Sequence, residues 1–396
     1  MDDASTIGVH LKRVRREHGY TQEGLAEKAN LSADTIRKLE QGRRTSARMT
    51  TLMRLANALD VDLTELTGKR ERLGSDRDGG SVLAIRDAIL TPSLLPGMPG
   101  LDPDDPGDPT PLTELRVTIG NAWRSYWKGD FGPLIATVPN LINETRLTHR
   151  TVGTAAAGAL AQSFQLAACL LLHLGKTDLA AVAAERGITA AAGGDDEWQW
   201  ATIVSTLAWV LMYQGRLTES ENLAVRVAEQ IEPSFSAPVP HLASWGNLLV
   251  AAIDTAAIAG REVKEYISMA SAGAERIGGP VAAYQTTFGS SKVAVNATHA
   301  YTMARKTGEA LAEAKKVHVK DLPTIAYGHH LLDLAQTHVD ARQYRAAELR
   351  LDEAHGLSSV WFRHQHLAVT LVGETRAAQT RPSSTIRVLA RAVGLD

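Results

Sequence analysis

The sequence predicts an all-α protein with a bundle of short helices at its N-terminus and an array of helical hairpins behind it. Three observations lead to this fold class. Aromatic residues make up 5% of the chain while alanine is abundant, which favours closely packed helices. The first seventy residues contain short amphipathic segments with capping residues, and a helical-hairpin pattern recurs from residue 112 onward. At 396 residues, 44% of them hydrophobic, the chain is long enough for two or three domains.

The N-terminal bundle is predicted to hold five helices. The first spans residues 6–18, and Thr21 and Ser32 stand at the N-cap positions of the second and third. Ile36 and Leu39 form the apolar face of the third helix. "RMTTLMRLANAL" and "DLTELTG" supply the fourth and fifth. Because only a short turn separates the second helix from the third, the pair forms a helix-turn-helix.

This N-terminal segment is basic and resembles a known family. Between His10 and Arg54 there are eleven Lys or Arg residues against five Asp or Glu, an excess of six on a chain whose net charge is −2. Such a patch indicates a polyanionic partner for this segment. The run from "LKRVRREHGYTQEGLAEKANLSADTIRKLEQGRR" to "TLMRLANALDVDLTEL" resembles the XRE or phage-repressor family of DNA-binding domains over about residues 6–67. The resemblance implies that double-stranded operator DNA is a partner.

In that family the third helix lies in the major groove, where each base pair presents a distinct hydrogen-bonding pattern. The residues expected to read bases are Ala33, Asp34, Thr35, Arg37 and Lys38. Arg37 or Lys38 can donate to guanine, and Asp34 can accept from cytosine. The residues expected to contact phosphates are Gln22, which matches the family's phosphate-contacting glutamine, and Arg43 and Arg44, which follow the third helix. The opposing interpretation is that these charges are ordinary solvated side chains.

A linker separates the two predicted domains. Residues 69–80 are charged and glycine-rich, and "SVLAIRDAIL" has the pattern of one amphipathic helix. Residues 91–111 then contain seven of the chain's fifteen prolines, which excludes regular secondary structure. The predicted boundaries are therefore a DNA-binding domain at 1–68, a linker at 69–111 and a helical domain at 112–396.

The helical domain shows a repeated hairpin with the spacing of small and large residues typical of a tetratricopeptide repeat. Its turns are predicted at Gly129, Gly175, Gly215, Gly260 and Arg305, and a sixth near residue 342. The intervals between them are 46, 40, 45, 45 and 37 residues, all longer than the 34 of a regular repeat, so we expect extended helices or loops. The whole architecture resembles regulators that join an XRE-type domain to a tetratricopeptide-like (TPR-like) domain, including peptide-sensing members from Gram-positive bacteria.

In such arrays the first helix of each hairpin lines the concave face. That register predicts a set of aromatic, amide and charged side chains, which is the composition of a pocket that orients a small molecule or peptide. The predicted effector-binding residues are Trp123, Tyr126, Gln162, Gln165, Ser205, Trp209, Asn247, Asp254, Lys292, His299, His329 and Gln336. The opposing interpretation is that these polar groups only solvate a wide groove.

Two functions remain open at this point. The first is a DNA-binding regulator that forms a homodimer, reads a pseudo-palindromic operator and senses a small-molecule or peptide effector with its helical domain. The second is a regulator whose helical domain is a scaffold that docks a partner protein. A broad polar groove favours the scaffold, and a closed pocket around Trp209 and Asn247 favours the effector. The last helices, from "VWFRHQHLAVTLV" onward, are the candidate dimer interface.

Other chemistry is not expected. The single Cys169 lies in an apolar run and has no partner for a disulfide, which fits a cytoplasmic protein. The histidines lack the spacing of a metal site, and no phosphate-binding loop or nucleophile motif is present, so we expect no metal, no cofactor and no enzymatic activity. No uninterrupted apolar run of about 18 residues predicts a membrane span.

Overall fold

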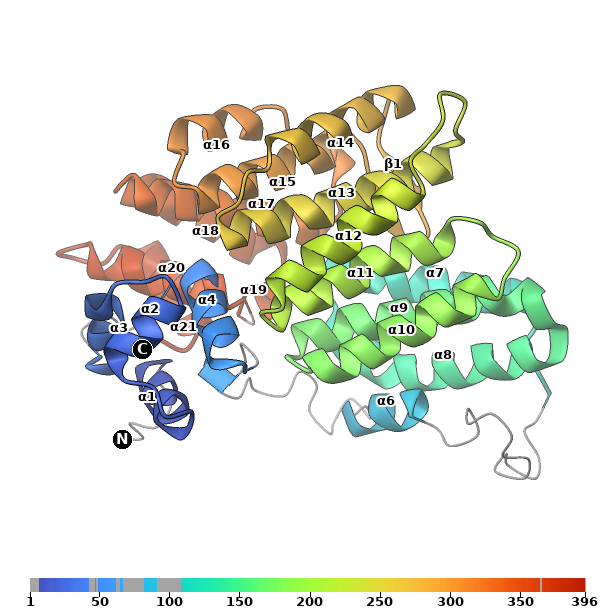
Figure 1. The fold of residues 1–396 in the computed structure, drawn as a ribbon, viewed down its shortest axis with the longest axis horizontal. Helices are drawn as coiled ribbons and strands as arrows, with labels where there is room; N and C mark the ends of the chain where they lie inside the picture. Colours follow the sequence, from blue (N-terminus) through green and yellow to red (C-terminus); the bar gives the residue numbers. More distant parts are fainter. Residues whose placement is uncertain are drawn as a thin grey trace.

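The computed structural model describes residues 7–42, 47, 49–61, 65–66, 82–90, 108–363 and 365–395. Within these ranges a small N-terminal helical unit packs against a larger, curved array of helices (Figure 1). The prediction of an all-α protein with a bundle followed by helical hairpins is confirmed.

The N-terminal unit consists of α1 (Ile7–Glu17), α2 (Gln22–Lys28), α3 (Ala33–Glu40) and α4 (Met49–Leu59). Both predicted N-caps are present: Thr21 Oγ1 accepts a hydrogen bond from the Gly24 amide, and Ser32 Oγ accepts one from the Thr35 amide. These caps start α2 and α3 on either side of a tight turn. The predicted fifth helix lies largely outside the described residues.

A third element, α6 (Val82–Ile89), confirms the helix predicted inside the linker. It lies along α8 and buries Ile85, Ala88 and Ile89 in the core of the helical domain. The Arg146 guanidinium donates to the Ala88 carbonyl oxygen at the C-terminal end of α6, which satisfies one of the carbonyls that a helix end leaves free. This part of the linker is therefore fixed to the helical domain.

The helical domain is a succession of antiparallel hairpins. The six predicted pairs are α7 (Leu112–Lys128) with α8 (Phe131–Val152), α9 (Ala157–His173) with α10 (Thr177–Ala192), α11 (Gln199–Tyr213) with α12 (Leu217–Gln230), α13 (Val239–Ala259) with α14 (Lys264–Ile277), α15 (Ser290–Met303) with α16 (Thr307–Ala314), and α17 (Thr324–Asp340) with α18 (Tyr344–Leu357). The chain ends with α19 (Ser359–Arg363), α20 (His366–Ala377) and α21 (Ser384–Ala392). Two short 3₁₀ turns, η3 (Gly153–Ala156) and η4 (Val319–Asp321), connect helices within this series.

Each of the six predicted turns contains a residue with a left-handed backbone. The φ angle is 76° at Gly129 and 81° at Gly215, and it is 59° at Arg305 and 58° at Arg342, although these two residues are not glycines. Glycine is needed most at Gly129, because a Cβ there would lie 3.0 Å from atoms of Ile325 and Trp361. The first hairpin therefore packs closely on the sixth, and α7 contacts α17, so the array curves back upon itself.

A small β-hairpin was not predicted from the sequence. Strands β1 (Val281–Ala283) and β2 (Thr286–Phe288) pair antiparallel between α14 and α15. The two turn residues, Tyr284 and Gln285, have φ angles of 50° and 66°, although neither is the Asn or Gly that such a turn prefers. This insertion explains part of the long interval between the fourth and fifth hairpin turns.

Two segments, Phe131–His173 and Val239–Ala259, are long and apolar enough to cross a membrane by length and composition. In each, 83% of the apolar window is buried inside the protein. Helices that are apolar on all sides are expected where other helices surround them. Here both segments form the centre of the array, where α9 and α13 each contact several neighbouring helices.

Candidate DNA-binding surface and cavity

The third helix presents a polar face to solvent. Asp34, Arg37 and Lys38 are exposed, Ala33 and Thr35 are half-buried, and the intervening Ile36 and Leu39 are buried. Lys38 Nζ lies 2.6 Å from Asp34 Oδ2, and Arg37 Nη2 lies 3.4 Å from Glu23 Oε1. Exposed ion pairs of this kind contribute at most about 1 kcal/mol. These side chains can therefore exchange their present partners for DNA at little cost.

A buried ion pair fixes the position of α3. The Arg15 guanidinium on α1 contacts both carboxylate oxygens of Glu40 at the end of α3, at 2.6 and 2.9 Å, and also donates to the Tyr20 carbonyl oxygen. The predicted phosphate ligand Gln22 donates its amide to Glu40 Oε2 at 2.7 Å, so α2 joins the same cluster. The other two predicted phosphate ligands, at positions 43 and 44, lie outside the described residues.

The DNA-binding unit packs on the helical array through α4. Met212, Leu217 and Ile258 of the array join the hydrophobic core of the N-terminal unit. The backbone of Asn57 in α4 lies against Gly215, and the Arg54 guanidinium lies against Gly260, so α4 covers two neighbouring hairpin turns. Figure 1 shows α3 on the side of the unit that faces away from α11, α12 and α13. The contact therefore leaves the recognition helix accessible.

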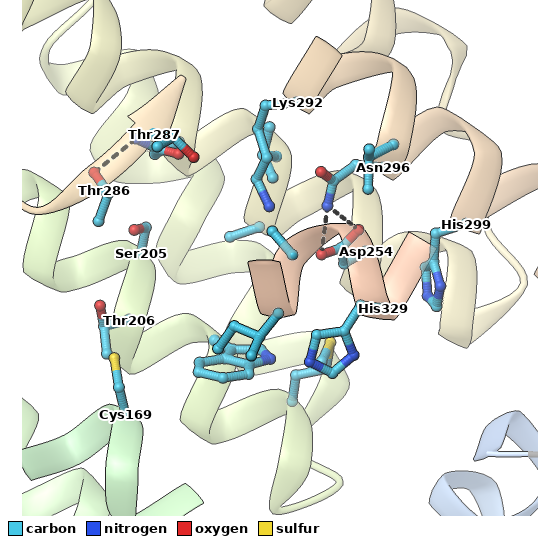
Figure 2. Close-up of a pocket in the computed structure, with 18 of the residues that line it drawn as sticks. Cys169, Ser205, Thr206, Asp254, Thr286, Thr287, Lys292, Asn296, His299 and His329 are labelled. Carbon is cyan, nitrogen blue, oxygen red and sulfur yellow. Dashed lines mark hydrogen bonds between the residues drawn. The ribbon is translucent and has the colours of Figure 1, made fainter. Parts of the chain in front are cut away.

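A cavity of about 300 Å³ lies inside the curve of the array. The first helix of each hairpin contributes to its wall, and β2 and the start of α20 complete it. Nine of the predicted residues line the cavity, namely Trp123, Tyr126, Ser205, Trp209, Asn247, Asp254, Lys292, His299 and His329. Figure 2 shows several of these side chains around one space. Their juxtaposition is a structural fact, and their binding role stays a prediction.

Three predicted residues do not line the cavity. Gln165 is fully buried and donates to Thr206 Oγ1, and Gln336 is 3% exposed and donates to Asp340 Oδ1. Gln162 is half-buried and lies outside the wall. On α9, Cys169 and His173 face the cavity instead. The reason is that α9 is buried on nearly every side, so its sequence carries little amphipathic signal from which to set the register.

The prediction also missed residues that the structure adds to the wall. Four of them follow a predicted cavity residue by four positions, namely Trp127, Tyr213, Asn296 and Asp333, and His173 follows the cavity residue Cys169 in the same way. Residues four apart lie on the same face of a helix, so the signal was present in the sequence. Thr286 and Thr287 come from the β-hairpin that the sequence did not predict.

One side of the cavity is aromatic. The rings of Trp123 and Tyr126 meet edge-to-face with centroids 5.4 Å apart, and Trp123 stacks on Trp127 at 6.3 Å. Tyr126 Oη lies 3.2 Å from His173 Nε2. Burial raises the pKa of the adjacent Cys169 thiol to about 12, so the thiol stays protonated and is a poor nucleophile.

The opposite side is charged. His299 Nδ1 lies 2.9 Å from Asp333 Oδ1. Burial alone would lower the pKa of His299, but the hydrogen bond and charge of Asp333, with the charge of Asp254, raise it to about 9. Burial lowers the pKa of the neighbouring His329 to about 4, so at neutral pH one imidazole is charged and the other neutral.

Next to this pair lies a carboxylate held by an amide. Asn296 Nδ2 donates to both oxygens of Asp254, at 2.7 and 2.8 Å (Figure 2). Burial raises the pKa of Asp254 and lowers that of Lys292. Lys292 extends from α15 into the same space. The two groups attract each other electrostatically, although no direct ion pair joins Lys292 to any residue that the structure describes.

The β-hairpin closes one side of the cavity. Trp127 Nε1 donates to the Gln285 carbonyl oxygen at 3.0 Å, and Tyr284 Oη donates to Asp196 Oδ1 at 2.6 Å. Asn247 Nδ2 donates to Thr286 Oγ1 at 3.1 Å. The hairpin is thus tied to the first, second and fourth helical hairpins or the loops that follow them.

One helix belongs to both functional regions. Trp209, Met212 and Tyr213 near the end of α11 line the cavity. The same three residues pack against the core of the DNA-binding unit. A change in side-chain packing at this end of α11 therefore acts on the surface where α4 rests.

Comparison with known proteins identifies the N-terminal unit. The helix-turn-helix family HTH_3 matches residues 11–66. An uncharacterised HTH-type transcriptional regulator of Sinorhizobium fredii is 39% identical over 66 residues, which are 17% of this chain and 84% of that protein. The chain belongs to the helix-turn-helix transcriptional regulators. The regulator is also 36% identical over 64 residues to the immunity repressor protein of Bacillus phage phi105, covering 16% of this chain and 44% of the repressor.

A solved structure aligns with a larger part of the regulator. Bacillus thuringiensis PlcR, in complex with the peptide PapR7 and DNA, aligns with 69% of this chain and 96% of its own, at 15% identity and a TM-score of 0.29. At that TM-score the two proteins do not superpose as wholes.

The candidate dimer interface stays a prediction. In "VWFRHQHLAVTLV", Val360 is 39% exposed, whereas Trp361, Phe362, Leu371 and Val372 are fully buried within the chain. They pack in the main core together with α17 and α18. The exposed apolar side chains in this last part of the chain include Val360 and, on α21, Val388, which is 51% exposed.

Proposed function

We propose that this regulator binds a pseudo-palindromic operator as a homodimer and changes its DNA affinity when a small-molecule or peptide effector occupies the cavity. The observation that carries the proposal is the shared end of α11, whose Trp209, Met212 and Tyr213 contact the cavity on one side and the DNA-binding unit on the other. An effector that repacks these side chains changes how α4 rests on the array. In a dimer, that movement alters the separation of the two recognition helices.

On the operator, α3 enters the major groove. Arg37 and Lys38 are the donors to guanine, and Asp34 is the acceptor for cytosine, while Ala33 and Thr35 contact base edges or the thymine methyl group. Gln22 at the start of α2, with Arg43 and Arg44 after α3, supplies the phosphate contacts that set the register. The exposure of Asp34, Arg37 and Lys38 supports this assignment.

The lining of the cavity favours an effector over the alternative of a scaffold for a partner protein. It has the mixture of aromatic and polar lining expected of a ligand pocket, and both Trp209 and Asn247 belong to it. Its volume of about 300 Å³ suits a small ligand.

Thermal unfolding in the presence of fractionated cell extract tests the proposal. A ligand that binds only the folded state raises Tm, so the low-mass fraction should stabilise the regulator. Ala251→Trp fills the cavity and should abolish this shift, whereas Ala312→Trp on the exposed face of α16 should retain it. Stabilisation by the high-mass fraction alone, unchanged in Ala251→Trp, contradicts the proposal and supports the scaffold.

A further inference from the structure

The cavity contains a cation without a direct partner. Lys292 Nζ makes no hydrogen bond or ion pair with the described residues, although the side chain is half-buried in the cavity wall and burial lowers its pKa. Other charged groups at this end are better paired, because His299 contacts Asp333 and Asp254 accepts two bonds from Asn296. A buried charge is costly unless it is paired. Lys292 is therefore the group that a ligand satisfies most directly.

A second polar group in the cavity also lacks a hydrogen-bond partner. Asn296 is 4% exposed, and its Oδ1 has no hydrogen-bond partner among the described residues. The amide nitrogen is already used by Asp254, which leaves the oxygen as a buried acceptor. It sits one helical turn from Lys292 on α15, next to the Asp254 carboxylate (Figure 2). A hydrogen-bond donor on a ligand would satisfy this acceptor.

The charged residues around the cavity also limit which ligands can bind. Counted as two basic residues, His299 and Lys292, against two aspartates, Asp254 and Asp333, the site has no net formal charge. A ligand that brings only an anion places a third negative charge beside Asp254 and Asp333. A ligand that also carries an ammonium or another donor relieves that repulsion. Trp209 and the aromatic wall then offer the surface for an apolar body.

We propose that the effector is a small organic acid that also carries a hydrogen-bond donor, as an amino acid or hydroxy acid with an apolar or aromatic side chain does. Its anionic group pairs with Lys292 Nζ, and its donor reaches Asn296 Oδ1 and Asp254. The same chemistry occurs at the carboxyl terminus of a short peptide. This inference rests on the proposed function, because it names the ligand class of the same cavity.

The test compares acids with their neutral amides by isothermal titration calorimetry on the full chain. The probes are tryptophan, phenylalanine and 3-phenyllactate, each beside its primary amide, with Gly-Phe and Gly-Phe-amide as the peptide arm. At concentrations up to about 10 mM, which reveal millimolar affinities, at least one acid should bind about tenfold or more tightly than its amide, the factor for one charge-assisted hydrogen bond. Preference for Gly-Phe over the free acids assigns the site to a peptide terminus and supports the same chemistry.

Two variants locate the effect. Lys292→Met should remove the preference for the acid, while Lys315→Met, at an exposed lysine after α16, should keep it. Asp254→Asn should weaken the binding of tryptophan but not that of 3-phenylpropionate, which has no donor and is relieved of the repulsion from the Asp254 carboxylate. Binding of a neutral amide that is unaffected by Lys292→Met shows that the variant still folds.

The inference is overturned if no acid binds better than its amide, or if Lys292→Met keeps the preference. These failures are separate from failure of the proposed function. If the low-mass extract fraction stabilises the wild type but no acid is preferred, effector sensing stands and the ligand class is wrong. If acids bind through Lys292 but leave operator affinity unchanged, the site stands and the regulatory function is wrong.

Discussion

At the scale of single residues, Arg37 is expected to carry the largest share of base recognition. Its guanidinium is exposed and is held only by a 3.4 Å contact with the exposed Glu23. A bidentate Arg–guanine contact contributes about 1–3 kcal/mol of discrimination. Arg37→Ala should therefore weaken binding to an operator selected from random duplexes by about that amount and relax specificity at one position.

Fluorescence anisotropy with the selected operator and single-base variants measures both effects. Arg124→Ala, at an exposed arginine on α7 far from α3 in sequence, is the control and should bind as the wild type does. A uniform loss of affinity across all base variants would instead assign Arg37 to the phosphate backbone.

The charged side of the cavity makes stability depend on pH. The pKa of His299 is raised from 6.5 to about 9 in the folded protein. The folded state therefore holds a proton that the unfolded state releases between these two values. The resulting stabilisation is fully present below about pH 6.5 and is lost as the pH rises through about 9.

Thermal unfolding at several pH values from 6 to 9.5 measures this contribution. His299→Gln should unfold at a lower temperature than the wild type at pH 6, and the difference should shrink towards alkaline pH. His338→Gln provides the control, because the half-buried His338 does not line the cavity and its ring bonds to Gln343. A His299→Gln difference that does not vary with pH would mean that the His299–Asp333 pair is not charged.

At the scale of elements, the β-hairpin has a strained turn and also closes one side of the cavity. Gln285 has a φ of 66°, a left-handed backbone conformation that glycine adopts without strain. Its backbone oxygen, and not its side chain, accepts the hydrogen bond from Trp127. Gln285→Gly should therefore keep the closure of the cavity and stabilise the protein by roughly 1 kcal/mol. Thermal or denaturant unfolding measures the change.

The matched control for this substitution is Gln214→Gly. Gln214 caps α11 with a φ of −74°, so glycine gains nothing there and should be neutral or destabilising. If both variants lost stability equally, the turn at Tyr284–Gln285 would not be strained.

The comparison between sequence and structure also belongs to the scale of elements. Caps at Thr21 and Ser32 and the six hairpin turns were predictable, because each rests on local chemistry that the residue types reveal. The β-hairpin was not, because Tyr-Gln is an unusual turn sequence and its bonds to Trp127 and Asp196 span distant parts of the chain.

The residues of the candidate site were also predictable only in part. Amphipathic helices such as α7 showed which residues face inward, so Trp123 and Tyr126 were found. On the buried α9, three-dimensional packing decides the orientation, and Gln162 and Gln165 were assigned to the cavity wrongly. Pairings between helices, such as Asp254 with Asn296, follow only from the curvature of the array.

At the scale of the whole molecule, the DNA-binding unit and the array form one packed assembly in the described residues. The charged, glycine-rich residues 69–80 of the linker lie outside the described residues, whereas α6 is fixed to α8, and α4 covers two hairpin turns of the array. The contact surface places Met212 and Tyr213 between the cavity and the DNA-binding core. In the proposed mechanism, an effector in the cavity therefore acts on the DNA-binding unit through this packed contact.

Operator affinity with and without effector tests this account most directly. We would measure binding of the selected operator to the wild type and to Trp209→Ala, each with and without the low-mass extract fraction or the acid that binds most tightly. The account predicts a change in affinity of about fivefold or more in the wild type, the usual lower range of allosteric coupling. It predicts a much smaller change in Trp209→Ala, even when calorimetry shows the ligand bound. Operator affinity in the wild type that stays the same with the cavity occupied would contradict it.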